Sequence, residues 1–163
     1  MLKKFLFIFL IALVVIQFFH PKRNKTTSDQ PNYIGKVYAV PDDVKSVLEK
    51  ACNDCHSNNT RYPWYCNFQP IDWWTNKHIL DGKRHLNFDE FNNKSPRYQY
   101  NKIGECKEQI EKGEMPINSY LWIHKDAKLT QAEKNTLFAW TESIRNDLKS
   151  KYPMDSLIRK KQP

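Results

Sequence analysis

The chain has 163 residues, which is enough for one ordinary domain and hardly two. Its formal net charge is +8, but five of the 26 basic residues and no acidic residue lie in positions 1–25. The rest of the chain carries 21 basic against 18 acidic residues, a net of +3 that a solvated surface explains. We therefore expect no nucleic-acid partner.

An apolar run opens the sequence. Residues 5–19 are apolar except for Gln17, and two lysines precede them, as in a secretory signal. No small-x-small cleavage site follows, which favours an uncleaved anchor over a cleaved signal. Residues 1–20 are therefore predicted to be a signal anchor and a single transmembrane helix, although the run is short for a bilayer. Residues 21–40 are rich in turn formers and are predicted to be a polar linker.

Four segments after the linker have helical periodicity, and none alternates as a strand does. Residues 42–52 place their apolar side chains on one face. The second helix starts after Pro70, presents Trp74 and His78 on one face, and is expected to end at Gly82.

The last two helices have marked ends. Ser95, followed by a proline, is expected to cap the third helix, and Gly113 to end it. The fourth opens with a capping box at residues 130–133. The sequence therefore predicts an all-α, cytochrome c-like domain over residues 41–150, followed by a C-terminal tail at residues 151–163.

The segment "CNDCH" fits the C-x-x-C-H attachment site for c-type haem. Cys52 and Cys55 lie three positions apart, so one helical turn puts both thiols on the same side, where they can add to the two vinyl groups of one porphyrin. His56 can then bind the iron as the proximal ligand. We expect a backbone carbonyl near Pro63 or Pro70 to accept a hydrogen bond from its Nδ1–H. These residues predict one covalently bound haem c.

Three other interpretations of the cysteine pair stay open. A thioredoxin-like redox site would need a βαβ setting, and a zinc site would need a second pair of ligands. The third interpretation is a structural disulfide. The other two cysteines, Cys66 and Cys106, either form a disulfide with each other in an oxidising compartment or remain two free thiols of the core; the disulfide is the preferred prediction, and the sequence does not fix the pairing.

Met115 is the predicted sixth ligand of the iron. It lies in the loop after the third helix, is followed by the stiff Pro116, and stands 59 residues after His56, a cytochrome-like spacing. The sequence leaves three histidines as alternative ligands: His78, His85 and His124.

Aromatic residues are dense between the motif and the second helix. They are expected either to wall a flat haem or to fill an ordinary aromatic core. They are Tyr62, Trp64, Tyr65, Phe68, Trp73 and Trp74.

On these residues the chain resembles the bacterial haem-binding domain family, which is cytochrome c-like. The matching stretches are "QFFHPKRN", "CNDCHSNNTRYPWY", "PIDWWTNKHILDGKRHLNF", "GEMPINSYLWIHKDAKLT" and the helix around Trp140. The resemblance implies that Cys52, Cys55 and His56 form the haem motif and that Met115 belongs to a Met-Pro motif. It also implies electron exchange with a cytochrome c peroxidase-like partner.

The resulting hypothesis is an electron carrier, not an enzyme, held at the cytoplasmic membrane with its domain facing the periplasm. Two filled axial positions on the iron would leave little room for a substrate. Two alternatives remain. One is a haem-based sensor or peroxide-reactive protein with an open or labile distal site, and the other is a non-haem interaction domain braced by disulfides.

Overall fold

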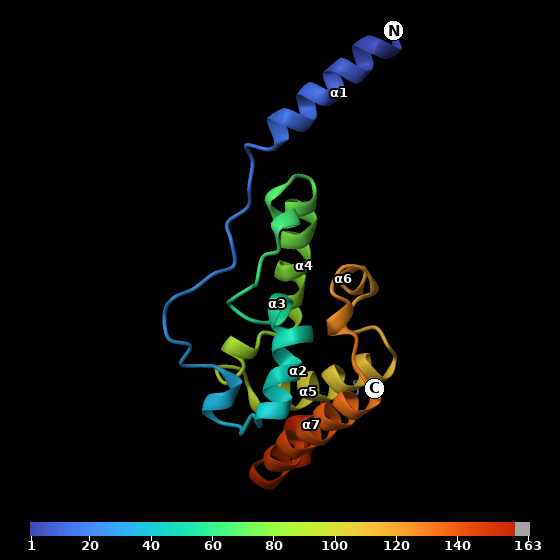
Figure 1. The fold of residues 1–163 in the computed structure, drawn as a ribbon. Helices are drawn as coiled ribbons and strands as arrows, with labels where there is room; N and C mark the ends of the chain where they lie inside the picture. The colour runs from blue at the N-terminus through green and yellow to red at the C-terminus, as the bar shows by residue number, and fades with distance from the viewer. Residues whose placement is uncertain (159–163) are drawn as a thin grey trace, which may run out of the picture.

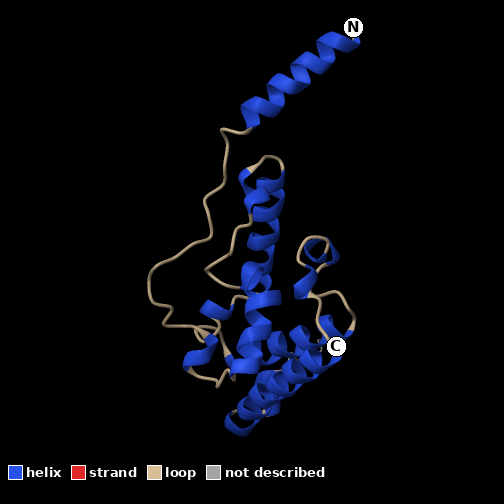
Figure 2. Cartoon of the chain, viewed as in Figure 1, coloured by secondary structure: helices blue, strands red, loops and turns tan. Residues whose placement is uncertain are grey.

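The computed structural model describes residues 1–158 and contains helices, turns and loops, with no strand in that range (Figure 2). Residues 159–163 of the predicted tail lie outside the described residues. The all-α prediction is confirmed. The α-helices are α1 (Leu2–Ile16), α2 (Asp42–Ala51), α3 (Asn53–His56), α4 (Ile71–His85), α5 (Pro96–Glu111), α6 (Asn118–Leu121), α7 (Gln131–Lys151) and α8 (Met154–Leu157). The 3₁₀ helices are η1 (Ile34–Lys36), η2 (Trp64–Asn67), η3 (Phe88–Glu90) and η4 (Lys125–Ala127).

The hydrophobic core lies where α7 packs across α5 and α2 (Figure 1). The apolar face predicted for residues 42–52 is buried in α2. The capping box is also present, because the Thr130 hydroxyl accepts from the Glu133 amide and the Glu133 carboxylate accepts from the Thr130 amide. These three helices contribute ten residues to the core: Val44, Val47, Leu48, Tyr100, Ile103, Ile110, Leu137, Trp140, Ile144 and Leu148.

Helix α4 differs from its prediction in two ways. It continues past Gly82 to His85, because Gly82 lies against the backbone of α3 and is needed there for close packing rather than as a helix stop. Its buried residues are Asp72 and Ile79, whereas Trp74 is exposed. Trp74 and His78 do share one face, as predicted, with ring centroids 4.4 Å apart, but Trp74 is not part of the core.

Helix α1 projects away from the other helices and has no buried residue (Figure 1). Within residues 1–158 no helix has both the length and the apolar character to cross a membrane, so the transmembrane helix expected at residues 1–20 is not supported. The chain that follows α1 is fixed to the domain. Asn24 donates from its backbone to the Tyr62 hydroxyl and from its side chain to the Ser57 carbonyl.

Candidate functional site

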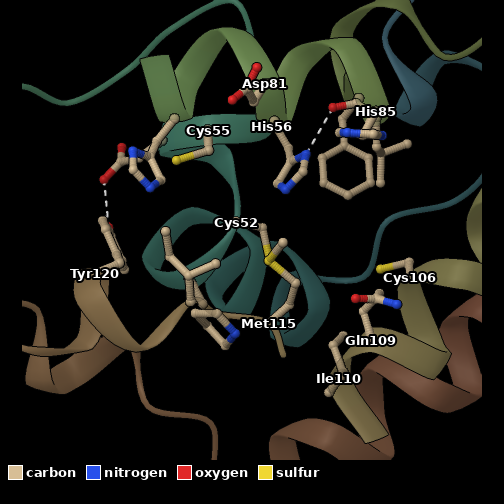
Figure 3. Close-up of a pocket in the computed structure, with 18 of the residues that line it drawn as sticks. Cys52, Cys55, His56, Asp81, His85, Cys106, Gln109, Ile110, Met115 and Tyr120 are labelled. Atoms are coloured by element: carbon tan, nitrogen blue, oxygen red, sulfur yellow. Dashed lines mark hydrogen bonds between the residues drawn. The ribbon is translucent and has the colours of Figure 1, made fainter. Parts of the chain in front are cut away.

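A cavity of about 450 Å³ opens between α3, α4, α5 and the loop after α5. Its walls are mostly apolar, and all four residues predicted to hold the haem line it: Cys52, Cys55, His56 and Met115. Figure 3 shows the His56 ring entering from the side of α4 and Met115 from the side on which α5 ends. The structure thus brings together residues that lie up to 63 positions apart in the sequence.

The proximal wall depends on a close approach between α4 and the cysteine motif. A Cβ at Gly82 would lie 2.7 Å from the Cys55 carbonyl oxygen and 3.0 Å from the Cys55 Cβ. Backbone atoms cannot swing aside as a flexible side chain can. Only glycine therefore allows α4 to pack at this distance from α3.

The packing of α4 also fixes the orientation of His56. Its Nδ1 lies 2.9 Å from the carbonyl oxygen of Leu86, the residue that follows the last turn of α4. The prediction that a carbonyl near Pro63 or Pro70 accepts this hydrogen bond is therefore wrong. A carbonyl only accepts, so Nδ1 carries the proton and Nε2 of the neutral ring keeps the lone pair that can bind a metal. Burial lowers the pKa of His56, and the Leu86 and Gly82 carbonyls partly oppose that effect.

All four cysteines are free, so the predicted disulfide between Cys66 and Cys106 is wrong. Cys66 is buried with its Sγ near the Thr75 hydroxyl, whereas Cys106 lines the cavity. Burial raises the pKa of Cys106 to about 11. An interaction domain braced by disulfides finds no support in this arrangement.

The two motif thiols are also protonated at neutral pH. Burial raises the pKa of Cys52 well above its ordinary value, and burial together with the charge of Asp54 raises the pKa of Cys55 to about 11. A thiol is a nucleophile mainly as its thiolate, so both are weakly reactive in the folded domain.

The opposite wall is built by the chain after α5. Gly113 ends the helix region as predicted, with a φ of 72° that a side chain rarely adopts. The Gln109 carbonyl then accepts hydrogen bonds from the amides of Glu114 and Met115, at 2.9 and 3.3 Å. These two bonds fold the loop back over the end of α5 and carry Met115 to the cavity, where its side chain is 38% exposed.

Two of the three alternative histidines also border the cavity. His78 and His85 lie on α4 and line it. His124 does not line it, because its ring stacks on Tyr120 with centroids 4.1 Å apart and its Nε2 lies 2.7 Å from the Tyr65 hydroxyl. His124 is therefore engaged elsewhere.

Asp54 joins the two walls, and its role was not predicted. Its carboxylate accepts from the Arg61 amide at 3.0 Å, from the Arg61 Nε at 3.1 Å, and from the Tyr120 hydroxyl at 2.7 Å. Burial, and next the hydrogen bond to Asp54, raise the pKa of Tyr120. Tyr120 lies five positions after Met115. The hydrogen bond from Tyr120 to Asp54 therefore connects the chain around Met115 to the cysteine motif. No local pattern reveals a partner 66 residues away.

The aromatic residues between the motif and the first turn of α4 do not wall the cavity, since none of the six lines it. Most of them do not form a core either. Trp64, Phe68, Trp73 and Trp74 are exposed, so the two expected roles are both wrong for these four residues.

The residues around the cavity fit a haem. The volume lies in the range of about 300–1,000 Å³ that is usual for small-molecule and cofactor sites. The thiols of Cys52 and Cys55 and the imidazole of His56 border the cavity from the short turn at α3, and the thioether of Met115 borders it from the opposite wall. Mostly apolar walls match a large flat apolar ring.

Comparison with known proteins agrees with this fit. The model of a family described as a haem-binding domain matches residues 11–143. No curated protein and no solved structure matches the chain.

Replacing Gly82 with alanine is expected to push α4 away from α3. The clash with Cys55 backbone atoms should lower the free energy of unfolding by about 1–3 kcal/mol and reduce the amount of haem retained. The measurement is urea unfolding together with the haem absorbance per chain. Gly104→Ala is the matched control, because its Cβ would meet only the Arg145 side chain at 3.5 Å and alanine favours the helix. Wild-type stability and haem content in Gly82→Ala would contradict this account.

Replacing Tyr120 with phenylalanine removes one hydrogen bond to a buried carboxylate. We expect a loss of about 1–3 kcal/mol in unfolding free energy, because the bond involves a charged acceptor. Tyr152→Phe, at an exposed tyrosine, should change stability by less than about 0.5 kcal/mol. Equal urea midpoints for the two variants would show that the tie between Asp54 and Tyr120 contributes nothing.

Proposed function

Because the chain belongs to the haem-binding domain family, we propose that it binds one haem covalently and carries single electrons. Cys52 and Cys55 would hold the haem by thioether bonds, His56 would be the proximal ligand and Met115 the distal one. The observation that carries the proposal is the convergence of these four side chains on one apolar cavity. When bound, the haem iron supplies a one-electron ferric–ferrous couple.

The cysteines serve attachment. Each thiol adds across one vinyl double bond, so that sulfur bonds to one carbon, a hydrogen is added to the other, and no oxidant is consumed. The raised pKa values of both thiols make them weak nucleophiles in the folded domain. We therefore expect attachment to require a maturation system that acts before the cavity is closed.

His56 and Met115 set the properties of the metal site. The bond from Nδ1–H of His56 to the Leu86 carbonyl holds the imidazole in one orientation and increases its basicity as a ligand. A methionine opposite a histidine gives a higher reduction potential than a second histidine. If His56 and Met115 both bound the iron of the haem, the site would favour electron transfer over binding of a substrate.

The proposed location is the outer face of the cytoplasmic membrane. The support is the apolar helix α1, which has no buried residue and carries two lysines in its first turn. The proposed partner is a redox protein, with a cytochrome c peroxidase-like protein as the candidate that the family resemblance suggests.

A second candidate function is a haem-based sensor. The observation that favours it is the partial exposure of Met115, which lies on a loop and not on a helix. A ligand of this kind is easier to displace than one held within a helix.

Carbon monoxide tests the two functions against each other. The reduced wild-type protein, loaded with haem, should keep its visible spectrum under carbon monoxide, whereas Met115→Ala should bind the gas. The midpoint potential of Met115→Ala should fall by something on the order of 100 mV, within the range of about 0.8 V that axial ligands control. Met154→Ala is the control, since Met154 lies in α8 and outside the cavity wall.

Either of two results would count against the carrier. Carbon monoxide binding by the wild-type protein would favour the sensor. A wild-type spectrum and potential in Met115→Ala would move the distal ligand to another residue, with His78 and His85 as the first candidates.

A further inference from the structure

Five large apolar side chains lie exposed at the first turn of α4 and on the nearby 3₁₀ helix η2. Their exposed fractions run from 41% to 75%. Exposed apolar groups clustered in this way mark an interaction site rather than an ordinary surface. We name this surface the apolar cap: Trp64, Phe68, Ile71, Trp73 and Trp74.

The apolar cap is fixed to the end of α1. The Gln17 side chain accepts from the Gln69 amide at 2.9 Å and donates to the Gln69 carbonyl at 3.2 Å. The Phe19 carbonyl accepts from the Trp73 indole and from the Gln69 side chain, both at 2.8 Å. Figure 1 shows α1 leading away from this end of α4. The exposed helix and the apolar cap therefore border one another, with the exposed Phe19 between them.

An ion pair to a buried carboxylate strengthens this connection. Asp72, fully buried at the start of α4, lies 2.7 Å from His20 Nδ1 and accepts from Arg23 Nη1 at 3.1 Å. Asp72 is the only acidic residue in positions 64–74, so the apolar cap presents no exposed negative charge. Residues 1–25 contribute five basic residues and no acidic one.

We propose that the apolar cap docks in the interface of a lipid bilayer that contains anionic lipids, beside the point where α1 inserts. Tryptophan prefers this interface, where its ring is in an apolar setting and its N–H can reach polar groups. The basic residues of the N-terminal segment complement anionic headgroups. This inference rests on the membrane attachment that forms part of the proposed function.

The docking would set the height of the haem cavity above the membrane. Trp74 belongs to the apolar cap, and His78, four residues later on the same helix, already lines the cavity. At 1.5 Å per residue the near edge of the cavity would stand roughly 6 Å from the interface, and α4 carries the cavity away from it as far as His85. Such a fixed position would leave the cavity accessible to a partner outside the bilayer.

Photolabelling of the wild-type protein tests the contact directly. The full-length, haem-loaded chain is mixed with vesicles of phosphatidylcholine and phosphatidylglycerol that contain a photoactivatable phospholipid, and labelled peptides are identified by mass spectrometry. We expect label in α1 and in residues 64–74, and none in residues 118–124. Label in α1 with none in residues 64–74 would overturn the proposal. That result is also the one expected if the apolar cap binds a protein instead of lipid.

Vesicle partitioning of variants gives an independent test. Trp64→Ala/Trp74→Ala should lower the vesicle partition coefficient about tenfold, because two exposed rings leave the interface. Trp122→Ala removes an equally exposed ring near α6, away from α1, and should keep the wild-type value. An unchanged partition coefficient in the double variant would overturn the proposal.

The haem absorbance of the same samples separates the two claims. A chain that carries haem but leaves residues 64–74 unlabelled would refute only the docking. A chain that binds vesicles through the apolar cap but carries no haem would refute the proposed function and leave the docking supported.

Discussion

The site depends on the contact between Gly82 of α4 and the backbone of Cys55, where no Cβ fits. Because α4 passes this close to α3, its last turn brings the Leu86 carbonyl to His56 Nδ1, 2.9 Å away. The same packing places His78 and His85 at the edge of the cavity. One backbone approach therefore defines the proximal wall and the orientation of the imidazole.

The second wall is brought to the first by polar bonds rather than by apolar packing. Tyr120 reaches Asp54 inside the cysteine motif, and Arg61 balances the charge of that carboxylate. On the outer side of α4, Asp72 is balanced in the same way by Arg23. Each of these two buried carboxylates is paired with an arginine. Asp54 connects the chain after Met115 to the cysteine motif, and Asp72 connects the N-terminal segment to α4, at the apolar cap. A buried carboxylate left without its partners is costly, which suits positions that fix geometry.

Several features with a local signal were predicted correctly, although the helix end expected at Gly82 was not, and features that depend on distant partners were missed. The capping box at Thr130 and the left-handed conformation of Gly113 depend on residues that are close together in the sequence. The partners of His56 and Asp54 lie 30 and 66 positions away, where no sequence pattern points to them. The aromatic stretch was misassigned because composition does not tell whether such a ring faces a cavity or the surface. The position of α4, set by Gly82, decides that question.

The most direct test of the central claim is the intact mass of the denatured chain after expression with a cytochrome c maturation system. The account predicts a mass equal to the polypeptide plus one haem for the wild type, and the mass of the polypeptide alone for Cys52→Ala/Cys55→Ala. A wild-type chain without added mass under the same conditions would contradict covalent attachment, and the cavity would then need another occupant.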